Sequence, residues 1–231
     1  MILRVKWTRR ATPTARRVAL DLASAPFRFL AGQWALVGAA GQPLRRPYSI
    51  ASAPEDVART GELEFLMKTG EKGGAGPHLP AIRRGLAVAL EGPRGRFVFP
   101  RRPAERHVLF VAGGTGIAPV RAMLRHALAA HPGLDLAVIY SARSPAELAY
   151  RRELQALARE GRIRLALTVT GEAGSHWRGE RGRINLARLE AMLADRRTLC
   201  FVCGPPSLVA DVPPLLERLG VARSRIRRER Q

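Results

Sequence analysis

From residue 107 onward the chain alternates strictly between strand-like and helix-like segments, and this order limits the folds open to it. Buried-type apolar runs occupy residues 107–112, 134–142, 162–170 and 198–204. Helical segments follow them at 118–130, 146–160 and 185–194, and a helix interrupted by prolines follows at 208–220. Parallel strands need crossover helices, so the alternation predicts an α/β domain with a parallel sheet and helices on both faces.

Residues 2–99 show a different pattern of short apolar stretches and frequent Gly or Pro turns. Strands are expected at 63–68, 85–92 and 96–99, and only residues 76–85 have helical periodicity. Many short strands separated by turns are typical of a small antiparallel β-barrel. A Pro- and Arg-rich segment at 100–106 separates the two patterns, so we expect domains at 1–101 and 102–231.

The chain is strongly basic, with a net charge of +20 from 39 basic and 19 acidic residues. This charge could serve a nucleic acid, an anionic surface or an acidic protein partner. It could equally reflect a GC-rich genome, because only Lys6, Lys68 and Lys72 are Lys and the other 36 basic residues are Arg. No basic tract is interleaved with aromatic residues, which argues against a nucleic-acid groove.

The sequence gives no sign of a membrane, secreted or metal-binding protein. It has no apolar run of about 18 residues, as a membrane span needs, and no N-terminal apolar segment beside a cleavage site. Its two Cys, Cys200 and Cys203, lie on one expected strand without a second pair, so no disulfide framework, zinc site or iron–sulfur cluster is expected. We therefore expect a cytoplasmic protein.

A glycine-rich turn, VAGGTGIAPV at 111–120, leads from an expected strand directly into a helix. Gly113, Gly114 and Gly116 let backbone N–H groups approach an anion, and the helix N-terminus adds a partial positive charge. A tight strand–helix connection without a ligand would have the same glycines. The turn therefore indicates a phosphate site without proving one.

Two departures separate this turn from the ordinary dinucleotide fingerprint. Pro119 stands where the fingerprint has its third Gly, and the next strand ends without an acidic residue for ribose hydroxyls. Ser141, Arg143 and Ser144 instead offer donors that suit an adenosine 2′-phosphate. The sequence thus favours NADPH over NADH.

Three motifs occur in order along the chain: RPYSIAS at 46–52, GGTGIAP at 113–119 and CGPP at 203–206. With them the chain resembles the ferredoxin–NADP reductase superfamily over nearly its whole length. The resemblance implies an FAD-binding antiparallel β-barrel followed by an NAD(P)-binding domain with a parallel sheet. FRFLAGQW, GGAGPHL and EGPRGRFVF fall where the family has landmarks of its barrel.

The resemblance implies an FAD site along the strand of the first motif. Arg46 would pair with the cofactor phosphates, Tyr48 would stack on the isoalloxazine ring, and Ser49 would lie near flavin N5. Pro47 cannot donate to a sheet, so it suits an edge strand beside a ligand. A guanidinium fork suits phosphate oxygens. An edge strand with incidental side chains is the alternative.

The resemblance also implies that the strand ending in Met67 and Lys68 runs beside the ribityl and adenine parts of the cofactor. These two residues would contact the cofactor mainly through backbone atoms.

The expected phosphate turn of this FAD site departs from the family. Gly74, Ala75 and Gly76 would receive the diphosphate through their backbone. The family often has Ser or Thr where this chain has Gly76, and Pro77 has no N–H to donate. FAD retention would then depend on the turn backbone and on Arg46.

The resemblance also implies a nicotinamide site in the second domain. Gly114, Thr115 and Gly116 would meet the coenzyme diphosphate, and Arg143 with Arg183 would bind a 2′-phosphate. The coenzyme would be NADP, or NAD as the alternative.

The expected catalytic residues are Ser49, Cys203 and Glu229. Cys203 would face nicotinamide C4, with Gly204 and Pro205 shaping the approach, although a buried Cys is often only a small hydrophobic residue. Glu229 matches an acidic residue that members of the family have near their C-terminus.

These features predict an FAD-dependent NAD(P)H oxidoreductase. It would pass electrons to a separate acceptor. This acceptor would be an acidic redox protein (a ferredoxin or flavodoxin), an oxygenase component or a small molecule. An NAD(P)H:flavin reductase that releases its flavin is the first alternative. A non-catalytic electron-transfer subunit of a larger complex is the second.

Overall fold

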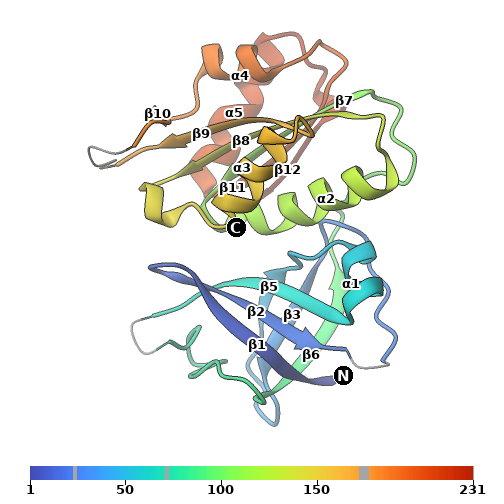
Figure 1. Cartoon of the computed structure of the whole chain (residues 1–231), viewed down its shortest axis with the longest axis vertical. Coiled ribbons are helices and arrows are strands. Elements are labelled where there is room, and N and C mark those ends of the chain that lie inside the picture. Colours follow the sequence, from blue (N-terminus) through green and yellow to red (C-terminus); the bar gives the residue numbers. More distant parts are fainter. Residues whose placement is uncertain (23–24, 71–72, 172–176, 231) are drawn as a thin grey trace. The chain divides into compact units, whose positions relative to one another are not determined.

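The structure is a computed structural model that describes residues 1–22, 25–70, 73–171 and 177–230 (Figure 1). The chain divides into two compact units, the first of Met1–Phe99 with Arg121–Ala129 and the second of Pro100–Val120 with the residues from Ala130 onward. The grouping of residues 121–129 with the first unit was not indicated by any sequence pattern.

The first unit is built on a sheet of six antiparallel strands (Figure 1). They are β1 (Ile2–Thr12), β2 (Ala15–Asp21), β3 (Trp34–Ala39), β4 (Arg46–Ser49), β5 (Glu62–Lys68) and β6 (Ala87–Arg94). Their order is β4-β3-β6-β1-β2-β5, and a bridge between Ile50, just after β4, and Phe65 of β5 closes the sheet. The expected antiparallel β-barrel is confirmed.

Alternate side chains of these strands form the barrel core. In β2 and β5, Val18, Leu20, Leu63, Phe65 and Met67 are at most 1% exposed and belong to one apolar cluster. Residues two apart in a strand point to the same face. The period-two spacing of apolar residues is therefore what directs this cluster inward.

The prediction of a strand at 96–99 is wrong. Phe97 and Phe99 are buried, but the segment pairs with a loop and not with a strand. Its Phe99 N–H donates to the carbonyl of Ala31 at 3.0 Å. Apolar alternation here reflects burial of side chains without a sheet partner for the backbone.

The helix expected at 76–85 is also wrong, and a helix outside it was missed. Residues 76–85 form turns, because Pro77 and Pro80 lack N–H donors and Gly76 has a φ of +115°. The missed helix is α1 (Pro54–Thr60), which begins with Pro at its first position. It ends at Gly61, whose φ of 66° suits a helix C-terminus.

The second unit contains a sheet of six strands whose pairings are all parallel. The strands are β7 (His107–Gly113), β8 (Asp135–Ala142), β9 (Arg164–Val169), β10 (Glu180–Arg181), β11 (Leu199–Gly204) and β12 (Ile226–Arg230). The helices are α2 (Ile117–Ala130), α3 (Arg151–Arg159), α4 (Leu186–Met192) and α5 (Pro206–Arg218), with 3-10 turns at Gly114–Gly116, Pro145–Glu147 and Arg223–Arg225. The expected α/β fold with a parallel sheet is confirmed.

The strand order of this sheet is β10-β9-β8-β7-β11-β12, so it reverses direction between β7 and β11. One face packs on α4 and α5, where Val111, Ile139 and Val202 cluster with Leu189 and Val212. Helix α3 lies on the other face (Figure 1). Ligands of open α/β sheets bind at the carboxyl ends of the strands where the order reverses.

Three elements of the second unit differ from expectation. Helix α3 begins at Arg151 and not at 146, because Tyr150 before it has a φ of 57°. The helix expected to be interrupted at 208–220 is continuous from Pro206 to Arg218 with Pro213 and Pro214 inside it. Strand β12 was not expected, because Arg occupies three of its five positions and hides the apolar pattern of a strand.

The approach of the glycine turn to β11 yields a stability prediction. A Cβ at Gly116 would lie 2.3 Å from the Cys203 carbonyl oxygen and 2.7 Å from Gly204 N, so Gly116→Ala must displace backbone. We expect it to lower the free energy of unfolding by about 2–3 kcal/mol, measured by urea denaturation. Gly133→Ala is the control, because no atom lies within 4 Å of its Cβ position. Equal stabilities for the two variants would contradict the close packing.

Candidate functional site

Strand β4 carries the first group of expected site residues at one end of the strand order. It pairs with β3 through Arg46–Val37, Pro47–Leu36, Tyr48–Ala35 and Ser49–Trp34. Arg46 and Pro47 are exposed, Tyr48 is half-buried and Ser49 is buried. The missing N–H of Pro47 therefore lies on a strand with a sheet partner on one side only, where Pro is tolerated.

Tyr48 is held by a residue that the sequence analysis did not select, His78. The Tyr48 hydroxyl lies 2.7 Å from His78 Nε2, and the two rings stack with centroids 5.7 Å apart. Burial raises the pKa of Tyr48 to about 12, against an opposing effect of Arg46. Burial first and Arg46 second lower the pKa of His78. Both side chains are therefore neutral near pH 7, and their contact is a hydrogen bond between neutral groups.

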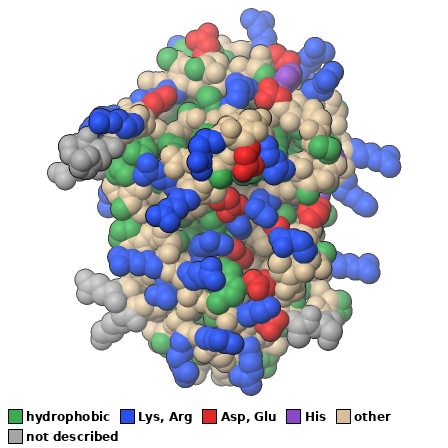
Figure 2. Space-filling model, in the orientation of Figure 1, with side chains coloured by type: hydrophobic (Ala, Val, Ile, Leu, Met, Phe, Trp, Pro, Cys, Tyr) green, Lys and Arg blue, Asp and Glu red, His purple; other side chains and the backbone are tan. Residues whose placement is uncertain are grey.

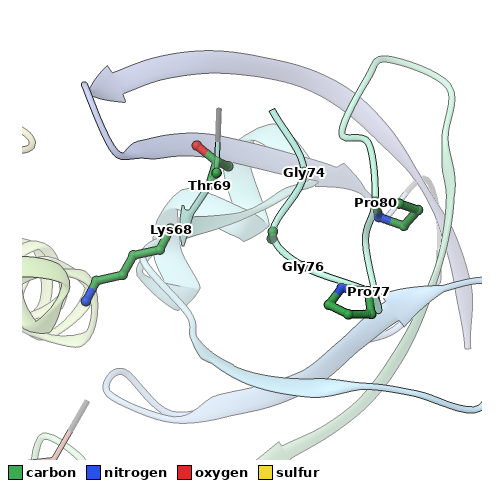
Figure 3. Close-up of a pocket in the computed structure, with 8 residues that line it drawn as sticks. Lys68, Thr69, Gly74, Gly76, Pro77 and Pro80 are labelled. Carbon is green, nitrogen blue, oxygen red and sulfur yellow. The ribbon is translucent and has the colours of Figure 1, made fainter. Parts of the chain in front are cut away.

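A cavity of about 590 Å³ opens beside the expected phosphate turn (Figure 3). Its lining consists of Lys68, Thr69, Gly70, Gly74, Ala75, Gly76, Pro77 and Pro80. The Lys68 side chain extends away from the Gly74–Gly76 segment (Figure 3). Most of the wall is glycine, proline or backbone, so a ligand here would meet main-chain groups.

Hydrogen bonds within the chain shape this turn. Ala75 N donates to Leu79 O at 2.8 Å, and Leu79 N donates to Gly76 O at 3.0 Å. A Cβ at Gly74 would lie 2.1 Å from the Pro80 carbonyl oxygen, so position 74 requires glycine. Met67 is fully buried in the barrel core, so its side chain cannot face a ligand.

These residues fit a flavin dinucleotide. Arg46 supplies an exposed cation, Tyr48 a flat ring and the glycine turn an uncrowded backbone. The Nδ1 atom of His78 is buried without a hydrogen-bond partner among the described residues.

The second group of expected residues meets where the strand order reverses. A Cβ at Gly204 would lie 3.0 Å from Gly113 Cα, so the ends of β7 and β11 touch through glycines. Gly114 is exposed with a φ of 54°, and Thr115 beside it is half-buried. Pro205 follows directly as the cap of α5.

Tyr140, also missed from the sequence, holds this turn from below. Its hydroxyl donates to the Gly114 carbonyl at 3.0 Å and accepts from Ala149 N at 3.2 Å. The side chain is fully buried, and burial raises its pKa far above the usual range. A Tyr near the end of an otherwise aliphatic strand was the signal that could have identified it.

Cys203 lies near the carboxyl end of β11, the strand between β7 and β12. It is in register with Ala112 of β7 on one side and Glu229 of β12 on the other. Cys203 is fully buried, and Glu229 Oε2 is buried without a hydrogen-bond partner among the residues described. Burial raises the pKa of Glu229 to about 7.

The residues expected at a 2′-phosphate are only partly brought together. Arg143 is exposed just after β8 and Ser144 is half-buried, but Ser141 is only 8% exposed within the strand. Arg183 lies beyond β10, where its guanidinium is 3.7 Å from Asp211. Arg181 was missed: Ala142, Val169 and Arg181 are in register across three strands, so Arg181 shares the sheet edge with Arg143.

Within residues 1–22, 25–70, 73–171 and 177–230, no helix is long and apolar enough to cross a membrane. The same residues contain no group of three or more His, Cys, Asp or Glu side chains placed to hold a metal ion.

Two family models match the chain. Residues 8–99 match an oxidoreductase FAD-binding domain, and residues 110–213 match an oxidoreductase NAD-binding domain. The first match covers the barrel and the second covers the sheet from β7 to the middle of α5.

Named relatives match the chain at full or partial length. Ferredoxin–NADP reductase B of Sorangium cellulosum is 35% identical, and the match covers 95% of this chain and 92% of that protein. The glycine betaine monooxygenase reductase subunit of Pseudomonas aeruginosa is 33% identical over 82% of this chain, which spans only 52% of that subunit. The crystal structure of an Amycolatopsis cytochrome P450 reductase has a TM-score of 0.84 with 26% identity, covering all of this chain and 69% of that one.

Burial of Glu229 yields a pH prediction. Because its pKa is raised from 4.5 to about 7 in the folded protein, its contribution to stability is present below about pH 4.5 and is lost as the pH rises through 7. We expect Glu229→Gln to abolish this loss, which amounts to about 1–2 kcal/mol after allowance for partial exposure. Unfolding free energies between about pH 5 and pH 8 measure it, with the exposed Glu190→Gln as control for a lost charge. Parallel pH profiles for wild type and Glu229→Gln would contradict the prediction.

Proposed function

The chain belongs to the ferredoxin–NADP reductase family, and we propose that it passes electrons from NADPH through FAD to a separate acidic redox protein. It is an FAD-dependent NAD(P)H oxidoreductase with an FAD-binding barrel and an NAD(P)-binding α/β domain. The observation that carries the proposal is that one chain contains two glycine-lined turns, one in each unit, and also an Arg and a stacking Tyr on β4. The reducing cytoplasm, where NADPH is plentiful, is the proposed location.

The barrel residues would bind and orient the flavin. Bound FAD supplies the chemistry, since it can accept an electron pair from nicotinamide and release single electrons. Arg46 would bind the diphosphate as a charged fork, and Gly74 and Gly76 would approach it with backbone N–H groups, since the N–H of Ala75 already donates to Leu79 O. Tyr48 would hold the ring system by stacking, with its own ring fixed by the bond to His78.

The α/β residues would bind the nicotinamide coenzyme at the strand reversal. Gly114–Gly116 and the start of α2 would receive its diphosphate. Cys203 would leave a small, dry approach for the nicotinamide ring, bounded by Gly204 and Pro205. Glu229, with its pKa near 7, would hold or release a proton beside Cys203. Ser49 would donate a hydrogen bond beside the reactive edge of the flavin.

Charge and composition support a separate protein acceptor. The net charge of +20 favours association with an acidic partner, and Arg and Lys side chains are spread over the visible surface (Figure 2). The two Cys of this sequence cannot supply the four ligands of an iron–sulfur cluster. A ferredoxin, a flavodoxin or an oxygenase component would then receive the electrons.

A second function is favoured by the phosphate turn itself. Gly76 and Pro77 offer neither a side-chain donor nor, at Pro77, an N–H, so flavin could be released after reduction. The chain would then act as an NAD(P)H:flavin reductase. Co-purification distinguishes the two: stoichiometric FAD after desalting supports the first function, and a colourless protein that reduces added riboflavin supports the second. A protein that does neither would leave a non-catalytic subunit.

The acceptor proposal predicts a salt dependence. With saturating NADPH, electron transfer to an acidic ferredoxin should be about tenfold or more slower at physiological or higher ionic strength than at low ionic strength. Salt screens the charges that steer the two proteins together. A basic cytochrome c is the matched acceptor control and should not slow. Salt-independent transfer to the acidic protein would reject the charge-steered partner.

The coenzyme proposal predicts the effect of one side chain. Arg143→Ala should raise the KM for NADPH by about tenfold or more and leave the KM for NADH nearly unchanged, because a charged contact to a phosphate is lost. Arg162→Ala is the control, since this exposed Arg precedes β9 at the opposite edge of the sheet. Equal effects on both coenzymes would reject a 2′-phosphate role.

A further inference from the structure

The turn at residues 181–183, at the end of β10, has a backbone that side chains hold in place. Arg188 of α4 donates from Nη2 to the Arg181 carbonyl and from Nη1 to the Arg183 carbonyl. The hydroxyl of the buried Thr168 donates to the Gly182 carbonyl at 2.7 Å. Three successive carbonyl groups are therefore bound by side chains, so this surface turn has less freedom than connecting segments usually have.

Arg188 also engages the carboxylate beside the turn. Its Nε forms an ion pair with Glu180 Oε2, and the side chain of Glu180 is 46% exposed. Without this partner, the carboxylate would repel an anion bound near Arg181. One guanidinium thus fixes the backbone of the turn and neutralises its acidic neighbour.

The turn presents a cation at the carboxyl edge of the sheet. Arg181 is exposed and is in register with Val169 of β9, which is in register with Ala142 of β8. The exposed Arg143 follows Ala142 directly. Neighbouring strands lie about 4.8 Å apart, so about 10 Å separates the ends of β8 and β10. Two arginine side chains can close a gap of that size around one phosphate group.

The end of β9 leaves room for the side chain of Arg143. A Cβ at Gly171, just after β9, would lie 3.2 Å from Arg143 Cγ and 2.9 Å from Arg143 O. Gly171 N donates to the same carbonyl oxygen at 2.8 Å. The Arg143 side chain therefore lies against a residue without a side chain, at the end of the strand that separates β8 from β10.

We propose that Arg181 binds the 2′-phosphate of NADPH together with Arg143, and that Arg188 is the positioning residue of Arg181. A phosphate monoester carries a charge of about −2 near pH 7, which suits two guanidinium groups. NADH has a hydroxyl at the same place, so this pair of arginines favours NADPH. A turn that already has its binding shape loses little entropy when the coenzyme binds. The inference rests on the proposed function in that the coenzyme occupies this edge of the sheet.

Two nucleotides isolate the phosphate group in the test. The nucleotide 2′,5′-ADP carries the 2′-phosphate and 5′-AMP lacks it, and neither contains nicotinamide. Their dissociation constants are measured by titration calorimetry on the FAD-loaded wild-type protein and its variants, and thermal unfolding reports the folding of each variant. We expect the wild-type protein to bind 2′,5′-ADP more tightly than 5′-AMP.

We expect Arg181→Ala to bind 2′,5′-ADP about tenfold or more weakly and 5′-AMP as tightly as the wild type, because only a charged contact to the phosphate is lost. Arg188→Ala should lose the same selectivity. Arg188→Lys should recover part of it, since an ammonium group can replace one contact of the fork but not all of them. Thr168→Val releases the Gly182 carbonyl and should reduce the selectivity even if Arg188→Ala does not fold. Arg162→Ala, which removes an exposed Arg before β9, is the control for a lost charge.

Three results would contradict the inference. Unchanged selectivity in Arg181→Ala would overturn its binding role. Unchanged selectivity in Arg188→Ala, or equal losses for both nucleotides, would overturn the positioning role, and so would unchanged selectivity in Thr168→Val where Arg188→Ala does not fold. Wild-type protein that binds 2′,5′-ADP no more tightly than 5′-AMP would overturn the proposed use of NADPH and the inference with it.

Discussion

The reversal of strand order between β7 and β11 is the constraint on which the second unit depends. It brings the turn after β7 against the end of β11 so closely that Gly116 has no room for a Cβ, and a Cβ at Gly204 would make tight contacts of 3.0–3.1 Å with Gly113. The same contact leaves the exposed Gly114 and the half-buried Thr115 at the carboxyl ends of the strands. Cys203 is in register there between Ala112 and Glu229. The phosphate site and the nicotinamide approach proposed here thus both depend on one backbone contact.

The barrel achieves a comparable arrangement by different means. Strand β4 has a sheet partner on one side, so Pro47 costs no ladder bond and Arg46 stays exposed. The facing turn is glycine-lined because Pro80 O leaves no space for a side chain at Gly74. Tyr48 and His78 connect the strand with the turn through a single hydrogen bond. A charged fork, a ring and an open backbone are therefore placed together with few specialised side chains.

The class of each domain could be predicted because it follows from local order: strict strand–helix alternation after residue 107 and short strands before it. Helix α1 was missed because seven residues are too few for a clear periodicity. Strand β12 was missed because Arg occupies most of its positions. The roles of His78 and Tyr140 depend on tertiary contacts, with Tyr48 and Gly114, between residues 30 and 26 positions apart. Arg181 became visible only through its register with β9.

We propose that this chain carries electrons from a nicotinamide coenzyme to FAD. An anaerobic titration of the FAD-loaded protein with NADPH tests it most directly. We expect the visible absorbance of the flavin to bleach in proportion to NADPH before any acceptor is present, and to return when an oxidised ferredoxin is added. A bound flavin that neither NADPH nor NADH bleaches would contradict it.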